Sequence, residues 1–273
     1  MIKYLIHSVR RKIARKITKK YPTRIDNFNI ATIGNLRFAN WENPLVKTKV
    51  ISLENINFFR KFLHEGDVAI DIGANIGHMT IPISIATGKK GMTLAFDPNP
   101  YVFEILSINS KLNPHITNIQ PFNYAISEED EDFYYNSSEA SFNNGGISRE
   151  KQNKHGKYSL DKKIKGIALE KFLMQSYKDS ISNIKLIKID TEGYDTEIIK
   201  SILKLVMKYK PVIISECFGK SSTEKRFKQF ELLNSIGYSL YYFSDFIENA
   251  EIIPIRKKED MCNWKHFDLY AII

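Results

Sequence analysis

Short apolar segments alternate with amphipathic ones along most of the chain. The run from Val68 to Ile72 is almost entirely apolar, which is typical of a central parallel strand buried on both faces. Further apolar segments of strand length follow at 91–96, 118–122, 184–189, 211–215, 239–243 and 267–272. Segments with helical periodicity lie between or before them, at 54–64, 73–87, 100–112, 194–209 and 223–236. Repeated strand–helix–strand units predict a mostly parallel α/β sheet with helices on both faces.

Two stretches do not follow this alternation. Residues 29–40 have the pattern of a β-hairpin, with Gly34-Asn35 at its turn. Residues 128–165 are polar and include Asn-Asn-Gly-Gly at 143–146, which predicts a long loop. In an α/β domain such a loop lies above the carboxyl ends of the strands, where ligands bind. We therefore expect residues 136–158 to contact the acceptor substrate.

The first 24 residues form a basic arm. Apolar residues at positions 2, 6, 9, 13 and 17 recur with helical spacing. The arm has no Asp or Glu, and its basic residues are Lys3, Arg10, Arg11, Lys12, Arg15, Lys16, Lys19, Lys20 and Arg24. Two interpretations fit equally: a helix in peripheral contact with an anionic membrane surface, or a helix docked on the domain with its charges in water. An Arg-rich, acid-poor start also resembles an organellar presequence.

The net charge of the chain resides in this arm. The chain has 273 residues, with 40 Lys and Arg against 31 Asp and Glu, for a formal net charge of +9. Without the nine basic residues of the arm, 31 Lys and Arg remain and balance the 31 Asp and Glu. A body without net charge argues against a broad nucleic-acid-binding surface.

The length fits one α/β domain with additions. We expect three parts: a basic amphipathic helix at 1–25, a hairpin and helix extension at 26–66, and the α/β domain at 67–273. No segment reaches the ~18 apolar residues that span a bilayer. The two cysteines, Cys217 and Cys262, have no metal-site or disulfide-framework spacing, which fits a reducing compartment such as the cytoplasm.

The strongest local motif is the sequence DIGANIG at 71–77, which follows a predicted strand. Its glycines allow a tight turn and the close approach of a ligand. Counted from Gly73, the dinucleotide fingerprint requires glycines where Asn75 and His78 stand, so a nicotinamide or flavin cofactor is disfavoured. A P-loop is excluded as well, because no Gly-Lys-Ser/Thr follows at the required spacing.

Two acidic residues indicate which ligand this turn binds. Asp71 precedes the first glycine, where a carboxylate is unfavourable beside a pyrophosphate but suits an ammonium or a sulfonium. Asp97 ends the next strand, where it can accept hydrogen bonds from ribose hydroxyls. S-adenosylmethionine has both a ribose and a cationic amino-acid end, so it is the predicted cofactor. Alternatively, Asp71 only caps the turn and Asp97 only starts the next helix.

A second motif, KLIKIDTEG at 185–193, places three charged side chains at the end of another strand. Lys188 and Asp190 point to the same side of that strand, which neighbours Val68–Ile72 in doubly wound sheets. Asp190 is the predicted general base for an acceptor hydroxyl, with Glu192 as the second choice. Lys188 would orient the carboxylate or hold an anionic acceptor. The alternative is an ion pair that only closes the strand end.

These motifs occur in the order seen in FkbM-type methyltransferases, which the chain resembles from about residue 67 to 216. The matching segments are DIGANIG at 71–77, DPNP at 97–100, NYAIS at 123–127, KIDTEG at 188–193 and KPVIISE at 210–216. The resemblance implies a Rossmann-like class I methyltransferase fold with seven strands and S-adenosylmethionine as methyl donor. It also implies O-methylation of a small-molecule or glycan hydroxyl.

By matching positions, the resemblance implies eight cofactor-binding residues. The methionine end would contact Asp71, Gly73, Ala74, Asn75 and Gly77, the ribose Asp97, and the adenine region Asn123 and Ala125. Two positions depart from the family pattern. The family more often has Glu at the position of Asp97. It usually has a Leu-Asp pair where this chain has Leu169-Glu170, so no role is assigned to Glu170.

Two other classes of function remain open on the sequence. One is an RNA or protein methyltransferase recruited through the basic arm, and the other is a non-catalytic module that keeps the fold to bind a partner. The intact glycine turn and both acids argue against the second. No His/Cys/Asp cluster indicates a metal, although paired carboxylates leave a divalent cation as a minor option.

Overall fold

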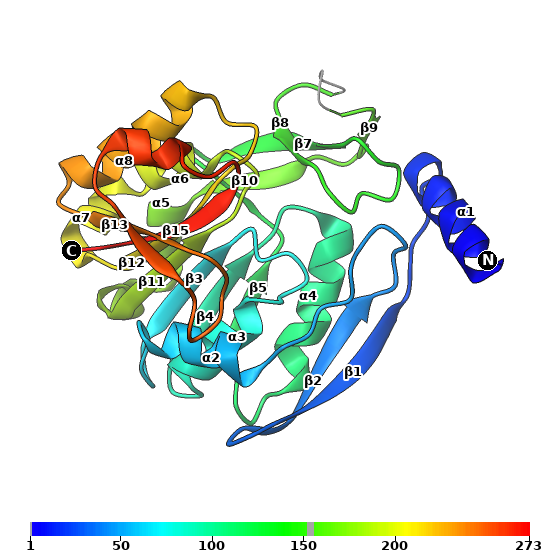
Figure 1. The fold of residues 1–273 in the computed structure, drawn as a ribbon, viewed down its shortest axis with the longest axis horizontal. Helices are drawn as coiled ribbons and strands as arrows, with labels where there is room; N and C mark the ends of the chain where they lie inside the picture. The colour runs from blue at the N-terminus through cyan, green and yellow to red at the C-terminus, as the bar shows by residue number, and fades with distance from the viewer. Residues whose placement is uncertain (1, 152–155) are drawn as a thin grey trace.

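The computed structural model describes residues 2–151 and 156–273, without the side chains of residues 2–5. The protein is built around an eight-stranded sheet with the order β14-β13-β15-β12-β11-β3-β4-β5 (Figure 1). Its strands are β3 (Val68–Ile72), β4 (Met92–Phe96), β5 (Ile119–Phe122), β11 (Ile184–Ile189), β12 (Val212–Cys217), β13 (Ser239–Phe243), β14 (Ile252–Ile255) and β15 (Phe267–Ile272). The strands from β5 to β12 are parallel, and the pairs beyond β12 are antiparallel.

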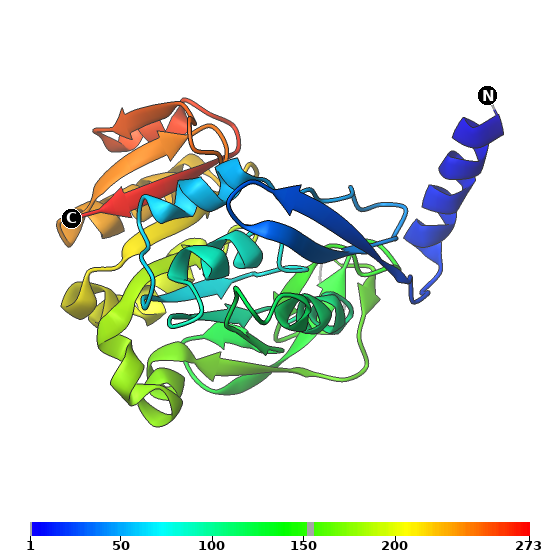
Figure 2. The same ribbon diagram turned by 90° about the horizontal axis from the view of Figure 1, so that it is seen from below.

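Helices cover both faces of this sheet (Figures 1 and 2). One face packs against α2 (Leu53–Arg60), α3 (Thr80–Thr87) and α4 (Pro100–Leu112). The other packs against α5 (Leu169–Ser176), α6 (Asp195–Ser201), α7 (Leu203–Tyr209) and α8 (Thr223–Ser235). Short 3₁₀ helices, η1 (Lys178–Asn183) and η2 (Lys258–Cys262), complete the second layer. Every residue of β3 is buried because both faces are covered, and this explains its continuous apolar sequence.

The sheet has one strand more than the predicted seven. The additional strand is β14, which lies at the sheet edge and pairs only with β13. It is four residues long and contains Pro254 opposite Tyr241. Proline cannot donate to a ladder, so it is compatible with an edge position but weakens the sequence signal for a strand.

The prediction of one long loop at 128–165 is wrong, because parts of this segment fold into a second sheet. Its strands are β6 (Ala125–Ser127), β7 (Glu131–Ser137), β8 (Gly146–Ser148), β9 (Tyr158–Ser159) and β10 (Ile164–Ala168). A small separate core of Tyr135, Phe142 and Ile164 supports it. These strands are short and are interrupted by polar residues or glycine, so they lack the apolar runs that mark the main sheet. Residues 152–155 of the predicted 136–158 acceptor segment lie outside the described residues.

Two predicted helices also differ from the observed ones. The helix expected from Gly73 begins only at Thr80, because residues 73, 75 and 77 have positive φ angles that an α-helix does not contain. The helix expected at 194–209 is interrupted at Ile202, which caps α6 and precedes α7.

The N-terminal hairpin consists of β1 (Thr23–Ile30) and β2 (Gly34–Trp41). Ile30 pairs with Gly34, so the turn comprises residues 31–33 rather than the predicted Gly34-Asn35. Before the hairpin, α1 (Ile2–Lys16) projects from the body of the protein (Figure 2).

Two asparagines, one in α4 and one directly after it, bind the free edge of β2 in place of another strand. Asn109 accepts from the Ala39 N–H at 2.6 Å and donates to the Ala39 carbonyl at 3.1 Å. Asn113, at the end of the helix, makes the same two bonds to Arg37 at 2.9 and 2.8 Å. Four residues of helix and two of strand both span about 6 Å, so the two patterns match. Asn109 also donates to the Ile76 carbonyl at 2.7 Å, which ties the hairpin to the glycine turn.

We predict that Asn109→Ala destabilises the protein by about 2–4 kcal/mol, because it leaves three buried backbone groups without partners. Urea unfolding of this variant and of Lys111→Ala, an exposed position on the same helix, gives the comparison. Equal midpoints for the two variants would contradict the role of Asn109.

Candidate active site

The turn after β3 is held between the two neighbouring strands. The N–H groups of Gly73 and Ala74 donate to the Phe96 carbonyl at the end of β4, over 2.9 and 3.0 Å. On the other side, a Cβ added to Gly73 would lie 1.9 Å from the backbone oxygen of Asp190. Gly73 also has a φ angle of +75°, in the region that favours glycine. Both the space and the backbone conformation therefore require glycine at this position.

Asp97, at the end of β4, is buried with its carboxylate held by the backbone. The Asn75 N–H donates to Oδ2 at 2.8 Å, and the Asn99 N–H donates to Oδ1 at 2.9 Å. Burial raises the pKa of Asp97 to about 7, and these two bonds offset only part of that effect. Each carboxylate oxygen can accept more than one hydrogen bond, so both can still accept from a ligand hydroxyl. This geometry fits the predicted contact with a ribose.

Asp71 and Lys188 form a buried ion pair between β3 and β11. They are direct register partners, and the Lys188 Nζ lies 3.2 Å from Asp71 Oδ1. The Thr80 hydroxyl donates to the other oxygen of Asp71 at 2.6 Å. Asp71 is fully buried, and Lys188 and Thr80 are the partners of its carboxylate. The sequence predicts instead that this carboxylate contacts the amino-acid end of a ligand directly.

Lys188 also contacts Asp190, whose Oδ2 lies 3.5 Å from the ammonium. This contact confirms that the two side chains point to the same side of the strand. Burial opposes the charge of Lys188, but Asp71 and Asp190 outweigh burial and raise the pKa of Lys188 above its ordinary value. The Asp190 side chain is 44% exposed, whereas those of Lys188 and Asp71 are inaccessible. Asp190 is therefore the member of this group that a ligand can reach.

Glu192 lies in a turn just beyond Asp190. Its φ angle is +52°, and Gly193 follows with a φ angle of +99°. A non-glycine residue in the left-handed region is uncommon, and such residues cluster at functional sites. Partial loss of water and the charge of Asp190 raise the pKa of Glu192. The predicted catalytic residues thus lie together, with Glu192 more exposed than Lys188.

A second group of acidic residues, not predicted from the sequence, lies beside Asp190. Burial, followed by the charge of Asp190, raises the pKa of Asp195 to about 6, of Asp268 to about 7 and of Glu216 to about 9. His266 Nε2 lies 3.0 Å from Glu216 Oε1. The other oxygen, Oε2, is buried and has no hydrogen-bond partner among the described residues. A buried oxygen without a partner marks a place where a ligand donor can bind.

The second sheet reaches the site through Asn99. The Asn99 amide donates to the Phe142 carbonyl at 2.6 Å and to the Tyr135 hydroxyl at 3.2 Å. Burial and the charges of Asp97 and Glu192 raise the pKa of Tyr135. Tyr135 therefore lies close enough to both Asp97 and Glu192 for their charges to act on it.

The two residues predicted near the adenine have different environments. Asn123 donates to the Asp97 carbonyl at 2.9 Å and lines a cavity of about 500 Å³ between the start of α4 and residues 160–165. Ala125 is buried in β6, where it pairs with Gly166 of β10. Gly77, the last glycine of the turn, has a φ angle of +92° and lies against Leu106 of α4.

The residues present fit S-adenosylmethionine. The tight turn, the buried Asp97 carboxylate that can still accept hydrogen bonds, and the acidic surroundings suit a ligand with a ribose and a cationic end. The same carboxylates would repel a pyrophosphate. Within residues 2–151 and 156–273, no three His, Cys, Asp or Glu side chains are arranged to hold a metal ion.

Comparison with known proteins identifies the family. The model of the methyltransferase FkbM domain matches residues 71–243, which is more than half of the chain. The chain belongs to the FkbM methyltransferase family. This membership confirms the predicted Rossmann-like class I fold and S-adenosylmethionine as the cofactor.

Individual relatives are distant. Hexuronic acid methyltransferase AglP of Haloferax volcanii is 27% identical over 151 residues, which cover 55% of this chain and 56% of AglP. The chain thus matches little more than half the length of that relative. The structure of the FkbM methyltransferase of Methylobacillus flagellatus KT is 13% identical with a TM-score of 0.45, over 76% of this chain and 43% of that one. The structure of an S-adenosylmethionine-dependent O-methyltransferase of Thermotoga maritima is 13% identical with a TM-score of 0.44, over 92% of this chain and 77% of that one.

We predict that Gly73→Ala destabilises the protein by about 3–5 kcal/mol, because the new methyl group would force the turn away from Asp190. The matched control is Gly34→Ala, which has a φ angle of +91° but no atom within 4 Å of the added Cβ. Backbone strain alone should cost the control about 1–2 kcal/mol. Thermal unfolding measures both variants, and equal losses would show that the close approach at Gly73 is unimportant.

Glu216 should make stability depend on pH. Its pKa of about 9 lies above the ordinary value, so the folded state binds the proton more tightly and stability falls as pH rises from about 4.5 toward 9. Glu216→Gln should therefore raise the melting temperature by roughly 2–8 °C at pH 8.5, with little change at pH 4.5. Scanning fluorimetry at both pH values measures this, with the exposed Glu128→Gln as control. A shift of the same size at both pH values would contradict the raised pKa.

Proposed function

We propose that this protein transfers the methyl group of S-adenosylmethionine to a hydroxyl group of a glycan or a related natural product. The observation that carries the proposal is the position of Asp190, an accessible carboxylate beside the glycine turn and 3.5 Å from a buried lysine. Family membership supports methyl transfer, and the name of the relative AglP supports a sugar acceptor.

The cofactor would be held along the carboxyl ends of β3, β4 and β5. We assign the ribose to Asp97 and the methionine end to the backbone of the turn at 73–77, with Asp71 acting through its pair with Lys188. The adenine would lie on the side of Asn123, toward the cavity beside α4. Asn75 contributes by orienting the Asp97 carboxylate through its N–H.

Bound S-adenosylmethionine supplies a methyl group that is activated by the adjacent sulfonium. Asp190 would accept the proton of the acceptor hydroxyl as the new oxygen–carbon bond forms and the sulfur–carbon bond breaks. The Lys188 ammonium would hold the Asp190 carboxylate in place, and Glu192 is the second candidate for the base. At neutral pH Glu216 keeps its proton, because its pKa is about 9, and would serve as a hydrogen-bond donor or acceptor to a second hydroxyl.

Charge around the site favours a hydroxyl as the methylated group. An acceptor carboxylate or a phosphate backbone would meet the carboxyl groups of Asp190 and Glu192, and like charges repel. A neutral hydroxyl carries no such penalty and can donate to these oxygens. We therefore prefer O-methylation of a sugar ring over esterification, and over methylation of RNA. A protein acceptor and a non-catalytic role are the remaining alternatives.

We predict that two substitutions separate cofactor binding from catalysis. Asp97→Ala should weaken the binding of S-adenosylhomocysteine, the demethylated product, by about 1–3 kcal/mol, since it removes a charge-assisted acceptor. Asp190→Asn should leave this affinity within about twofold and lower turnover by about 10²-fold or more, as loss of a general base does. Calorimetry measures the affinity, and methyl transfer from radiolabelled S-adenosylmethionine measures turnover.

The acceptors for this assay are neutral oligosaccharides, oligosaccharides of hexuronic acids, RNA and a protein extract. Label in the sugars alone supports the proposal, and label confined to RNA or protein replaces it with the corresponding alternative. If the intact protein fails to bind S-adenosylhomocysteine, the non-catalytic alternative takes first place. Unchanged turnover in Asp190→Asn removes that residue from its assigned role.

A further inference from the structure

The helix α1, together with Ile17 directly after it, exposes a continuous apolar stripe. The four stripe residues with described side chains are Ile6, Val9, Ile13 and Ile17, whose exposed fractions are 54%, 49%, 43% and 56%. Their spacing of three or four residues places them on one side of the helix. Large aliphatic side chains in a row rarely stay in water without a partner, so the stripe indicates an interaction surface.

Basic residues flank this stripe. The chain up to residue 24 contains nine Lys and Arg and no Asp or Glu, while the remainder is balanced. Arg10 lies on one side of the stripe and Lys12 and Lys16 on the other, given 100° of rotation per residue. An apolar stripe with cationic flanks is the pattern of a helix that lies in the interface of an anionic bilayer.

The stripe does not face the body of the protein. Ala14 is fully buried, and Arg15 pairs with Glu139 at 3.4 Å and accepts from the Ala140 N–H at 3.1 Å, so the contacts of α1 are near its carboxyl end. From this attachment the helix extends outward, and its amino end is the part farthest from the body in Figure 2. The stripe lies on a different side of the helix from Ala14, which leaves it free to contact another surface.

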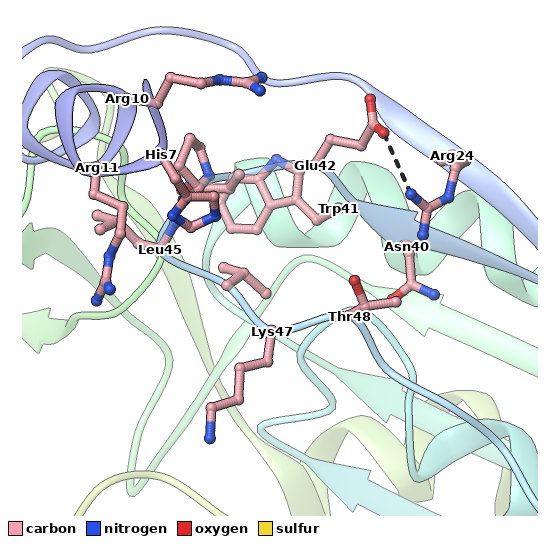
Figure 3. Close-up of a pocket in the computed structure, with 13 residues that line it drawn as sticks. His7, Arg10, Arg11, Arg24, Asn40, Trp41, Glu42, Leu45, Lys47 and Thr48 are labelled. Atoms are coloured by element: carbon pink, nitrogen blue, oxygen red, sulfur yellow. Dashed lines mark hydrogen bonds and ion pairs between the residues drawn. The ribbon is translucent and has the colours of Figure 1, made fainter. Parts of the chain in front are cut away.

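A cation-lined cavity lies between the middle of α1 and residues 40–48. It has a volume of about 530 Å³ and is bounded by His7, Arg10 and Arg11 of α1 and by Trp41 and Lys47 (Figure 3). No carboxylate in the described part of the chain pairs with Arg10, Arg11 or Lys47. The only acidic residue in the lining, Glu42, lies 3.7 Å from Arg24, which neutralises it. The cavity therefore has a net positive charge and suits the phosphate of a lipid headgroup.

We propose that α1 binds the surface of a bilayer that contains anionic phospholipids. The stripe of Ile6, Val9, Ile13 and Ile17 inserts among the acyl chains, the flanking cations contact headgroup phosphates, and the cavity takes one headgroup. The helix lies on the membrane and does not cross it: among the described residues no helix is long and apolar enough to span a bilayer. This inference does not depend on the methyl acceptor.

Charge and apolar area together distinguish a bilayer from the other possible partners. A nucleic acid would satisfy the cations but leave the four aliphatic side chains in water. A second copy of α1 would cover the stripe but bring two sets of unpaired cations together, which costs free energy. Of these three partners, an anionic lipid surface is the one that satisfies both features at once.

The attachment of α1 also connects the proposed membrane surface to the candidate active site. Ala140 and Phe142 belong to the same turn of the second sheet. Ala140 binds α1 through its N–H, and Phe142 accepts from Asn99, whose own N–H holds Asp97. A membrane-bound α1 therefore keeps the second sheet, and with it one side of the cofactor site, close to the bilayer.

The test is co-flotation of the full chain with two kinds of vesicle, one of phosphatidylcholine alone and one that also contains about one third phosphatidylglycerol. Each measurement is made at low and at high salt. We expect binding to the anionic vesicles that is at least about tenfold stronger than to the neutral ones and weaker at high salt. The triple variant Ile6→Ser, Val9→Ser, Ile13→Ser should lose at least about tenfold in binding.

The body of the protein offers a matched control. Met174, Met207 and Ile252 are 54%, 55% and 42% exposed. These exposed fractions are similar to those of the three substituted stripe residues. Replacing all three with Ser should leave vesicle binding within about twofold. A third variant, Arg10→Gln with Arg11→Gln and Lys47→Gln, should lose the preference for anionic vesicles. Circular dichroism and S-adenosylhomocysteine affinity confirm that each variant is folded.

Three outcomes overturn the proposal. The first is no association of the intact chain with anionic vesicles, and the second is equal association by the stripe variant. The third is a dimer, measured by light scattering, that the stripe substitutions convert to a monomer in a chain that does not bind vesicles. Binding to duplex RNA in place of vesicles belongs with the first outcome and assigns the arm to nucleic acid.

Discussion

A lysine ammonium buried between two carboxylates joins the central strands of the sheet. Lys188 of β11 contacts Asp71 of β3 at 3.2 Å and Asp190 at 3.5 Å, and the lysine is almost entirely out of water. Removal of either carboxylate would leave charge in the interior without full compensation, which is strongly destabilising. The pair therefore holds β3 and β11 in one register. That register in turn places the Asp190 carbonyl so close to Gly73 that no side chain fits at position 73.

The same arrangement gives the two sides of the site different chemistry. Asp190 is accessible and lies next to a fixed ammonium, whereas Glu216 is buried next to His266 and keeps its proton at neutral pH. Raised pKa values at Asp195 and Asp268 follow from the same crowding of carboxyl groups. In the proposed function, one accessible carboxylate and one protonated acid would bind two hydroxyl groups of one acceptor in different ways.

Side-chain amides attach the additions to the central domain. Asn109 and Asn113 satisfy the open edge of β2, and Asn99 holds the Phe142 carbonyl and Tyr135 of the second sheet. An amide can donate and accept at once, so it can replace a neighbouring strand at positions where backbone groups would otherwise be unpaired. Through these few residues the hairpin, the second sheet and α1 are all linked to the turn that is assigned to the cofactor.

The sequence alone determined the central sheet, the glycine turn and the acids at its strand ends, because these are local signals. An apolar run such as Val68–Ile72 must be buried on both faces, and the residue that follows a parallel strand lies at the ligand-binding edge. Only the tertiary structure decided which charged side chains lie next to each acid. Asp71 precedes the turn in sequence, but its partner Lys188 is 117 residues away. Glu216 and Asp268 likewise join Asp190 only through the order of β11, β12 and β15. The second sheet was not predicted, because short strands of mixed composition are stabilised by partners distant in sequence and not by a periodicity of their own.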